Sequence, residues 1–325
     1  MFILISAFSK SFDDIWLIYR VPNELNGIIK IGQIVEIPFK ASIEIWVVLA
    51  IQNKVDAQFD ESKIKEIISI KNDKIFISNY RVILLRWLAT YYFTAIHNSH
   101  NLFFPKNLAT KIVNWKIDLE FEKHKNTEYS YTFNHDLKLS QLQTSTFNEI
   151  NSLDHNKFLL YWLTWSGKTE IYIRLIKENF DNWKQSLLLI PEIILTNQIS
   201  TKIKKTFWND VLIINSTVTD ATKTKYWLDI NNCNAKIIIW TRSALFYPYN
   251  NLWLIIIDEE HDNSYISDSS PRYNSIEIAN KITELNWNKL LLASWTPSVN
   301  SMYNALKWDY KLVSLLETYN KKNNV

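Results

Sequence analysis

Two segments of the sequence hold residues that could bind a phosphate group and a metal ion. The first is Thr164–Glu170, TWSGKTE, which follows an apolar run and opens a helix-like one. A phosphate-binding loop has the pattern G-x-x-x-x-G-K-[ST], in which backbone N–H groups and a helix N-terminus surround the phosphates. Gly167, Lys168 and Thr169 fit this pattern, but Trp162 stands at the first glycine. The segment predicts a nucleotide-binding loop, with a structural turn as the alternative.

The second segment is Ile255–His261, IIIDEEH, in which an apolar run is followed directly by acidic residues. Ligands of open α/β sheets bind at the carboxyl ends of the strands, so a strand ending here would bring carboxylates to that edge. Asp258 would hold magnesium on the β- and γ-phosphates, and Glu259 would orient and deprotonate the attacking water. A solvated acidic turn is the alternative, but the position of this segment about 90 residues downstream of a phosphate loop favours the catalytic interpretation.

The apolar pattern predicts the elements that must position these segments. Residues 1–100 alternate apolar stretches with turn signals, which indicates a small β-rich domain, and residues 101–136 are polar and charged, as in a linker. Residues 137–325 alternate helical stretches with short apolar runs, typical of strands buried on both faces of a parallel α/β sheet. These runs are Phe158–Tyr161, Ser186–Ile190, Val211–Ile214, Lys236–Ile239, Leu252–Ile257 and Lys289–Leu292.

Composition limits the class of protein. The 325 residues are 47% hydrophobic, as in globular proteins, and the net charge is only +3, so any nucleic-acid surface must be local. No apolar run reaches the roughly 18 residues of a membrane span, and the N-terminus lacks the features of a signal peptide. We therefore expect a cytoplasmic protein with no membrane partner. The single cysteine, Cys233, cannot form a Cys-rich zinc site, so we expect no zinc.

A series of motifs in order resembles one family closely, the PriA primosomal replication-restart helicases of superfamily 2, also called primosomal protein N′. The motor motifs that carry the resemblance are FLLYWLTWSGKTEIY at Phe158–Tyr172, LLLIPEIILTNQ at Leu187–Gln198, IWTRSALF at Ile239–Phe246, LIIIDEEHDNSY at Leu254–Tyr265 and SWTPS at Ser294–Ser298. Weaker similarity covers the first 100 residues, through YRVP at Tyr19–Pro22, IGQIVEIPF at Ile31–Phe39 and RWLATYY at Arg86–Tyr92.

The resemblance implies an ATP-dependent DNA helicase that uses ATP and Mg²⁺ and moves 3′-to-5′ on forked or single-stranded DNA at stalled forks. Residues 137–325 would form a RecA-like motor lobe with a parallel sheet. Residues 1–100 would form a β-rich DNA-binding domain that recognises the 3′ end of a nascent strand. Ile18 stands where the family has an acidic or polar residue, and its side chain cannot hydrogen-bond a terminal nucleotide. Other primosome and replication-restart proteins would be partners.

The family motifs also imply a role for each matching residue at the nucleotide. Lys168 and Thr169 would hold the phosphates and magnesium, while Asp258 would bind the same ion and Glu259 would act on water. Gln143, in the segment LSQLQ, stands where a Q-motif glutamine reads adenine. The other residues of the cofactor-binding set are Trp162, Trp165, Ser166, Gly167 and Glu170.

Two further sets of residues would link the nucleotide to DNA. The coupling set is His261, Ser294 and Thr296, for which strand-end capping is the alternative. Thr241 and Arg242 would contact the DNA backbone. The segment matching the family's aromatic-rich loop holds Tyr265, Arg272 and Tyr273, and such side chains stack on unpaired bases, although surface-loop tyrosines are also commonplace.

The chain ends at Val325, shortly after SWTPS. A superfamily 2 motor hydrolyses ATP between two lobes, and the second lobe supplies arginines that stabilise charge in the transition state. We therefore expect a truncated chain, or one complemented by a separately encoded second lobe, with weak nucleotide binding and little hydrolysis alone. The alternatives are a non-catalytic fork-binding module that recruits primosome partners and another phosphate-loop enzyme such as a kinase, in which TRSALF, DEEH and SWTPS have no place.

The glycine and tryptophan counts are unusual. Average usage near 7% predicts roughly 23 glycines, but the sequence has 3 glycines and 14 tryptophans. Against the family pattern, glycine is replaced at Trp162, Trp165, Trp183, Trp208, Trp240, Trp253 and Trp308, and also at Trp46 and Trp287. Trp87 and Trp227 fall where the family itself has tryptophan. We hypothesise that the organism reads the codon UGA as glycine and that the sequence was translated as tryptophan.

Overall fold

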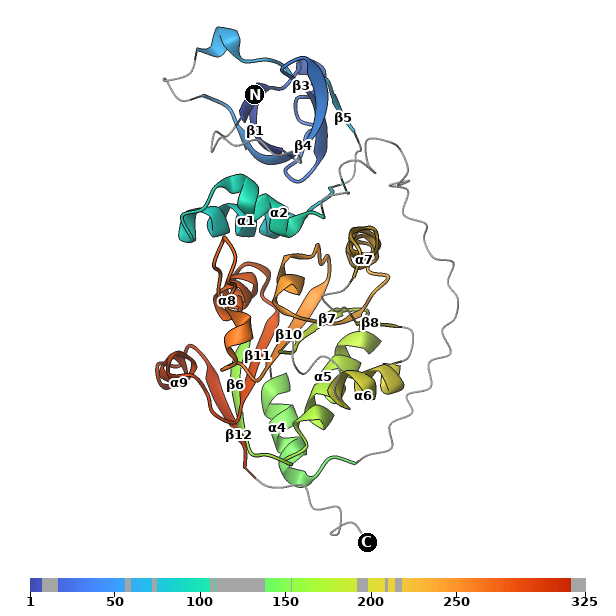
Figure 1. The fold of residues 1–325 in the computed structure, drawn as a ribbon, viewed down its shortest axis with the longest axis vertical. Helices are drawn as coiled ribbons and strands as arrows, with labels where there is room; N and C mark the ends of the chain where they lie inside the picture. Colours follow the sequence, from blue (N-terminus) through green and yellow to red (C-terminus); the bar gives the residue numbers. More distant parts are fainter. Residues whose placement is uncertain are drawn as a thin grey trace. The chain divides into compact units, whose positions relative to one another are not determined.

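In a computed structural model of the chain, the described residues are 1–7, 17–55, 60–71, 75–105, 108, 138–152, 154–191, 198–207, 210–213 and 218–316. Contacts divide the chain into two compact units (Figure 1). The first unit is Met1–Glu122 with Thr219–Trp227, and the second is Lys123–Val218 with Leu228–Val325. Most of the predicted linker 101–136 lies outside the described residues, so the predicted boundaries stay predictions.

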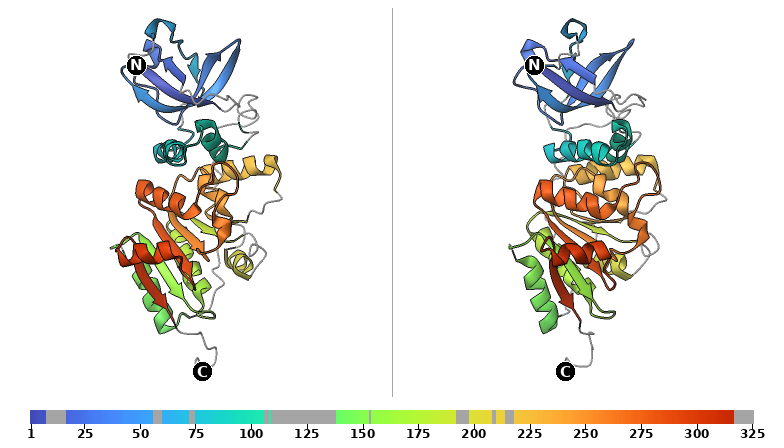
Figure 2. Two further views of the ribbon diagram at one scale, coloured as in Figure 1. Left: turned by 60° about the vertical axis from the view of Figure 1, so that its left-hand side comes forward. Right: turned by 90° about the vertical axis from the view of Figure 1, so that its left-hand side faces the viewer.

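The first unit is built on a five-stranded antiparallel sheet in the order β2-β1-β4-β3-β5, which curls strongly (Figure 2). Its strands are β1 (Phe2–Ala7), β2 (Leu17–Arg20), β3 (Ile34–Phe39), β4 (Ser42–Gln52) and β5 (Ser69–Ile70), with short 3-10 helices η1 (Asn23–Leu25) and η2 (Glu61–Lys63). Gly32 has φ +84°, and a Cβ there would lie 2.0 Å from the Ile77 carbonyl oxygen, so only glycine fits. The sheet confirms the β-rich domain that the sequence predicts.

Two helices, α1 (Asn79–Tyr91) and α2 (Ile96–Phe103), complete the first unit together with the first part of α7 (Asp220–Asn231). The indole of Trp227, on α7, is 1% exposed. It stacks on Phe76 with ring centroids 4.7 Å apart and donates a hydrogen bond of 2.8 Å to the Phe103 carbonyl. A sequence segment far from the N-terminus thus fills the core of this unit.

The second unit is a seven-stranded sheet in the order β12-β6-β11-β10-β7-β9-β8, and all of its pairings are parallel. Its strands are β6 (Lys157–Trp162), β7 (Gln185–Leu189), β8 (Val211–Ile213), β9 (Ile237–Trp240), β10 (Leu252–Asp258), β11 (Lys289–Ser294) and β12 (Lys311–Leu315). The six predicted runs all form strands. The α/β fold class with a parallel sheet is confirmed.

The strands of this sheet are buried because helices cover both faces. Helices α4 (Gln141–Asn151), α5 (Lys168–Asp181) and α6 (Gln198–Phe207) lie on one face, and α8 (Ser275–Asn286) and α9 (Val299–Leu306) on the other (Figure 1). Short 3-10 helices follow two strands, η5 (Arg242–Phe246) after β9 and η6 (Asn263–Tyr265) after β10. None of the helices in the described part of the chain is both long and apolar enough for a bilayer crossing.

The buried indole of Trp227 gives a test of the first unit. Trp227→Ala should lower the free energy of unfolding by about 3–5 kcal/mol, because it leaves a cavity and removes the partner of the Phe103 carbonyl. Trp87→Ala is the matched control, since Trp87 is only half-buried and should cost less. Chemical denaturation followed by circular dichroism measures both. Equal losses in the two variants would contradict the packing described for Trp227.

Candidate nucleotide-binding site

The candidate phosphate loop joins strand β6 to helix α5. Gly167, the N-cap of α5, has the left-handed backbone φ 78°, ψ 30°, and the Glu170 N–H donates to its carbonyl over 3.0 Å. The N–H groups of the first turn of a helix have no partner within the helix and carry partial positive charge. The end of α5 at Lys168 is therefore suited to bind an anion.

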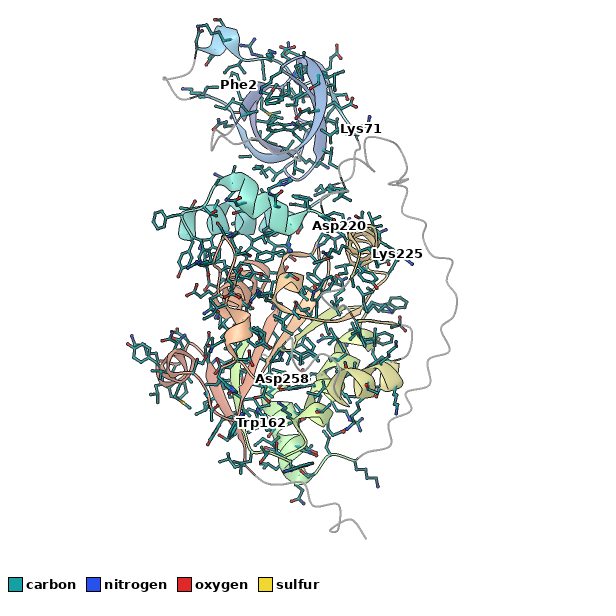
Figure 3. All side chains as sticks on the ribbon, in the orientation of Figure 1. Phe2, Lys71, Trp162, Asp220, Lys225 and Asp258 are labelled. Atoms are coloured by element: carbon teal, nitrogen blue, oxygen red, sulfur yellow. The ribbon has the colours of Figure 1, made fainter. Side chains whose placement is uncertain are left out.

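The Lys168 ammonium lies between two carboxylates from the end of β10. Its Nζ atom is 2.6 Å from Asp258 Oδ1 and 2.7 Å from Glu259 Oε1. The Tyr172 hydroxyl, one turn along α5, donates to Asp258 Oδ1 over 2.8 Å. Figure 3 labels Trp162 and Asp258, which mark the ends of β6 and β10 at the same edge of the sheet. The predicted loop and the predicted acidic strand end therefore meet.

Burial changes the acid–base behaviour of this cluster. It raises the pKa of Glu259, although hydrogen bonding and charge from Lys168 act in the opposite direction. Burial and the Asp258 carboxylate raise the pKa of Tyr172 well above its usual value, so this phenol stays protonated and donates. Glu259 also has φ 50°, a backbone conformation that is costly for a non-glycine residue and is often found at functional sites. A carboxylate with a raised pKa is a stronger base, as a water-activating residue requires.

Helix α4 is hydrogen-bonded to the phosphate loop through its first turn. Its N-cap, Ser140, accepts from the Gln143 N–H, while the Gln143 side chain accepts from the Ser140 N–H in a capping box. The Gln143 amide also donates to the Ser166 carbonyl over 3.0 Å. Gln143 is 1% exposed, so the structure places it under the phosphate loop; its reading of adenine stays a prediction.

The other loop residues have distinct surroundings. Ser166 is buried, and Glu170 is buried and forms an ion pair with Lys202 on α6. The indole of Trp162 is buried and lies 3.7 Å, ring centroid to Nζ, from Lys168. Trp165 is 85% exposed. Thr169 follows Lys168 in the first turn of α5, where a hydroxyl ligand for magnesium is expected.

The coupling residues gather at the ends of β10 and β11. The His261 Nδ1 atom lies 2.7 Å from the Ser294 hydroxyl and 3.9 Å from Glu259 Oε2. The Thr296 N–H donates to the same hydroxyl over 3.1 Å. The structure thus connects the candidate base to the segment after β11, and the coupling role of these residues stays a prediction.

The predicted DNA-binding residues lie on the segments after β9 and β10. Thr241 is buried at the end of β9, and Arg242 donates to the carbonyls of Ser264 and Ile266 over 2.9 and 2.6 Å. The Tyr265 ring is 2% exposed, and its hydroxyl donates to the Asp258 carbonyl over 2.6 Å. Tyr273 is 3% exposed and packs edge-on against Phe246, whereas Arg272 is exposed. In this conformation neither tyrosine ring can stack on a base, so stacking would require a rearrangement.

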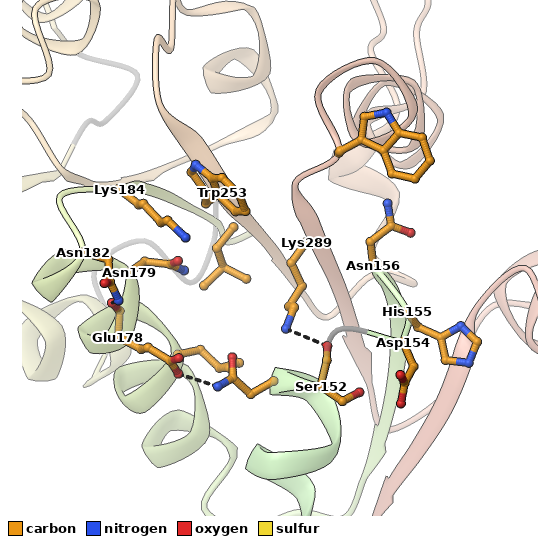
Figure 4. Close-up of a pocket in the computed structure, with 14 residues that line it drawn as sticks. Ser152, Asp154, His155, Asn156, Glu178, Asn179, Asn182, Lys184, Trp253 and Lys289 are labelled. Atoms are coloured by element: carbon orange, nitrogen blue, oxygen red, sulfur yellow. Dashed lines mark hydrogen bonds between the residues drawn. The ribbon is translucent and has the colours of Figure 1, made fainter.

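A pocket of about 370 Å³ lies at the opposite edge of the sheet, where β6, β10 and β11 begin (Figure 4). Lys289 extends into it and donates to the carbonyls of Ile150 and Ser152 over 2.5 and 3.4 Å. Burial lowers the pKa of Lys289 to about 8, with the charge of Glu178 opposing the shift. This pocket is separated from the phosphate loop by the length of the strands.

Comparison with known proteins assigns the family. The model of the DEAD/DEAH box helicases matches residues 140–304, which is more than half of the chain. The chain belongs to the DEAD/DEAH box helicase family. In addition, the model of a 3′ DNA-binding domain of PriA matches residues 8–105. The first range contains β6 to β11 of the parallel sheet, and the second contains β2 to β5 of the curled antiparallel sheet.

Relatives of this helicase chain include several replication restart proteins PriA. That of Rickettsia felis is 33% identical over 303 residues, covering 93% of this chain and 44% of the relative. The Bacillus subtilis protein is 36% identical over 190 residues, covering 57% and 24%, and that of Helicobacter pylori strain 26695 is 39% identical over 181 residues, covering 56% and 29%. The chain spans less than half the length of these relatives. Among solved structures, the Hef helicase domain of Pyrococcus furiosus matches with TM-score 0.42 and 16% identity, over 55% of this chain and 38% of that one.

Glu260 is a residue of the helicase lobe for which the sequence suggests no role. Its carboxylate is 2% exposed and accepts from the Ser298 N–H over 2.6 Å and from the hydroxyls of Ser298 and Ser301 over 3.0 Å each. Ser298 is the N-cap of α9, so the carboxylate also lies at the positive end of that helix. Glu260, which directly follows the candidate base Glu259, therefore fixes the N-terminus of α9. The only signal in the sequence is an acidic residue directly after Asp258 and Glu259, and it does not reveal that the side chain is buried.

The Glu260 contacts predict a local effect on α9. Glu260→Ala should lower the free energy of unfolding by about 1–3 kcal/mol and speed amide hydrogen exchange in α9, because three donors lose their buried acceptor. Ser298→Ala, which leaves the backbone N–H bonded to Glu260, should have a smaller effect. Unchanged exchange in α9 of the Glu260→Ala variant would show that this carboxylate does not fix the helix.

Lys289 predicts a pH dependence. Because its pKa is about 8 in the folded chain and near 10.5 when unfolded, the unfolded chain binds more protons between these values. The free energy of unfolding should therefore gain a favourable contribution as pH rises from about 8 to 10.5, and Lys289→Met should lose that rise. Denaturation of both chains across this range measures the difference in slope. Lys307→Met, at an exposed position, controls for charge removal, and identical slopes in all three chains would refute the shift.

Proposed function

We propose that this chain carries the ATP-binding lobe and the DNA-binding domain of a cytoplasmic replication-restart helicase that moves 3′-to-5′ on DNA at stalled forks. One observation supports this above all others, the meeting of Lys168 with Asp258 and Glu259 at one sheet edge. A lysine at a helix N-terminus and two acidic residues at a strand end are what a magnesium nucleotide needs. The PriA relatives support the choice of fork DNA as the substrate.

The residues at this edge have complementary tasks in ATP hydrolysis. Lys168 exchanges its carboxylate partners for β- and γ-phosphate oxygens, which releases Asp258 and Glu259 for their own roles. The Thr169 hydroxyl and the Asp258 carboxylate are the hard oxygen ligands that Mg²⁺ prefers, and the ion supplies charge that offsets the phosphates. Glu259 accepts a proton from the water that attacks the γ-phosphorus. The bond to the β,γ-bridging oxygen breaks, so ADP and phosphate leave.

Coupling to DNA would pass through the segments that follow the strand ends. His261 and Ser294 connect the candidate base to the segment containing Thr296, and Arg242 ties the end of β9 to the residues after β10. Each of these segments carries residues for which the family resemblance implies contact with DNA or coupling. We propose that a second motor lobe, in the same or a separate chain, supplies the arginines that complete the site, and that other primosome proteins bind the assembly.

One observation favours a second candidate function, a non-catalytic fork-binding module. The Trp162 indole lies over Lys168 and takes space next to the ammonium that phosphates would approach. Such a module would keep DNA binding and lack nucleotide hydrolysis. The two functions differ in what Lys168 and Glu259 contribute.

Two substitutions separate these functions. Lys168→Ala should weaken binding of Mg-ADP at least about tenfold, because one charge-assisted contact to phosphate exceeds 1.4 kcal/mol. Glu259→Gln should leave that affinity nearly unchanged and lower DNA-stimulated ATP hydrolysis by about 10²–10⁴-fold. Titration calorimetry and phosphate release with forked DNA measure these effects, with Lys307→Ala as the control. DNA binding with no measurable Mg-ADP affinity, unaltered by either substitution, would favour the non-catalytic module.

A further inference from the structure

The backbone places tryptophan where glycine is the preferred residue. In the described part of the chain, eleven residues have positive φ, which are the three glycines and eight others. Four of those eight are Trp165 (φ 67°), Trp183 (φ 58°), Trp287 (φ 54°) and Trp308 (φ 66°). Because 14 of 325 residues are tryptophan, eight residues drawn at random from the chain would contain fewer than one tryptophan on average. A side chain as bulky as indole is among the least suited to left-handed backbone.

Two of these residues complete the hydrogen-bond pattern of a glycine helix end. After α5, the Trp183 N–H donates to the Phe180 carbonyl and the Lys184 N–H to the Asn179 carbonyl, over 3.0 and 2.9 Å. After α9, the Trp308 and Asp309 N–H groups donate to the carbonyls of Ala305 and Asn304 over 3.1 and 3.0 Å. This is the Schellman motif, whose left-handed position is usually glycine.

The third helix end has the simpler form of the same device. The Trp287 N–H donates to the Thr283 carbonyl over 2.9 Å, as in the single-bond left-handed cap that follows many helices. The indoles of Trp183, Trp287 and Trp308 are 70%, 80% and 81% exposed. Burial of apolar area therefore offsets little of the backbone cost. Within the described residues, only the Trp183 ring of these three has a cation over it, with Lys236 Nζ 3.6 Å from the ring centroid.

The phosphate loop holds two tryptophans, each in surroundings that suit glycine better for a different reason. Trp165 combines φ 67° with 85% exposure. Trp162 is buried, its indole N–H has no hydrogen-bond partner within the structure, and its ring lies 3.7 Å from Lys168 Nζ. A phosphate must approach the loop backbone within hydrogen-bond distance, and an indole at either position interferes with that approach.

Other tryptophans have surroundings that suit an indole. Trp227 is 1% exposed, stacks on Phe76 and hydrogen-bonds through its indole N–H, and Trp87 stacks on Tyr91 with centroids 4.7 Å apart. Phe93 and Cys233 also have positive φ just after a helix, so the position alone does not exclude other residues. The four tryptophans differ from these residues in two ways. Each combines left-handed backbone with an exposed indole, and tryptophan is a rare residue type in the chain yet accounts for half of the described non-glycine residues with positive φ.

From this geometry we infer that the native protein has glycine at positions 162, 165, 183, 287 and 308, through UGA codons read as glycine, and tryptophan at position 227. Positions 183, 287 and 308 rest on backbone conformation alone. Position 165 rests on backbone conformation and on the proposed nucleotide-binding function. Position 162, the last residue of β6, rests on its unpartnered buried indole N–H and on that function, which both positions deepen. With glycine there, the loop becomes an open cradle of backbone N–H groups for the phosphates of a nucleoside triphosphate.

Mass spectrometry of the protein purified from its own cells tests the inference directly. Tryptic peptides 158–168, 178–184, 282–289 and 308–311 contain the five positions, and peptide 226–236 contains Trp227 as the internal control. We expect glycine masses in the first four peptides and a tryptophan mass in the control. Tryptophan in the four peptides overturns the inference, as does glycine at position 227. Codons support it if UGA encodes the five positions and UGG encodes position 227.

Recombinant chains test the consequence for the site. The double variant Trp162→Gly/Trp165→Gly should bind Mg-ADP at least tenfold more tightly than the chain with tryptophan. The triple variant Trp183→Gly/Trp287→Gly/Trp308→Gly is the matched control, which should leave the affinity unchanged and raise Tm by about 2–4 °C per site as backbone strain is relieved. An unchanged or lower Tm contradicts the assignment at the helix ends.

A further variant distinguishes failure of the inference from failure of the proposed function. In the double-glycine chain, Lys168→Ala should abolish the gain in Mg-ADP affinity. If the peptides contain glycine but no chain binds Mg-ADP, the nucleotide-binding function is wrong and the glycine assignment holds. If the peptides contain tryptophan while Lys168→Ala still weakens binding, the assignment is wrong and the nucleotide site stands.

Discussion

The helicase lobe depends on one buried charge, the Lys168 ammonium held between Asp258 and Glu259. An unpaired ammonium in this position would cost several kcal/mol, so the fold must bring carboxylates to it. The sheet does this by register, because Ala293 on β11, the strand between them, pairs with Leu160 of β6 on one side and with Asp258 of β10 on the other. Two inter-strand spacings, about 10 Å, then separate the loop from the acidic strand end. The side chains of Lys168 and Asp258 together bridge that gap, with Nζ and Oδ1 2.6 Å apart.

Buried hydrogen bonds hold the backbone of this edge in place around the charge. The Tyr265 hydroxyl donates to the Asp258 carbonyl and to the Leu189 carbonyl, which joins the ends of β10 and β7. Burial and nearby carboxylates raise the pKa of that phenol well above its usual value, so it remains a donor. Gln143 holds the loop through the Ser166 carbonyl. The catalytic candidates are therefore positioned by residues that would not themselves touch phosphate.

The sequence predicted the strands of the motor sheet because their two buried faces leave continuous apolar runs, as in β10, LWLIIID. It missed β12, an edge strand whose residues alternate between buried and exposed in the short segment KLVSL. It could not show that the rings of Tyr265 and Tyr273 are buried, because an aromatic residue in a loop has the same sequence pattern whether it packs inward or faces solvent; their role in DNA binding stays a prediction. Glu260 was overlooked for a related reason: an acidic residue in a run of acids does not reveal that three donors surround it.

The helix ends show how global packing sets local backbone. Helices α5, α8 and α9 must turn back toward the sheet within a few residues to enter β7, β11 and β12. A left-handed residue makes this reversal possible. Its N–H and, in the Schellman motif, that of the next residue donate to the last helical carbonyls, and its side chain has no part in those bonds. The turn is therefore required by strand order and helix length whatever residue occupies it. The side chain then affects only the free-energy cost of the left-handed backbone. An exposed indole at such a position raises that cost with little burial to compensate, so we infer that glycine belongs there.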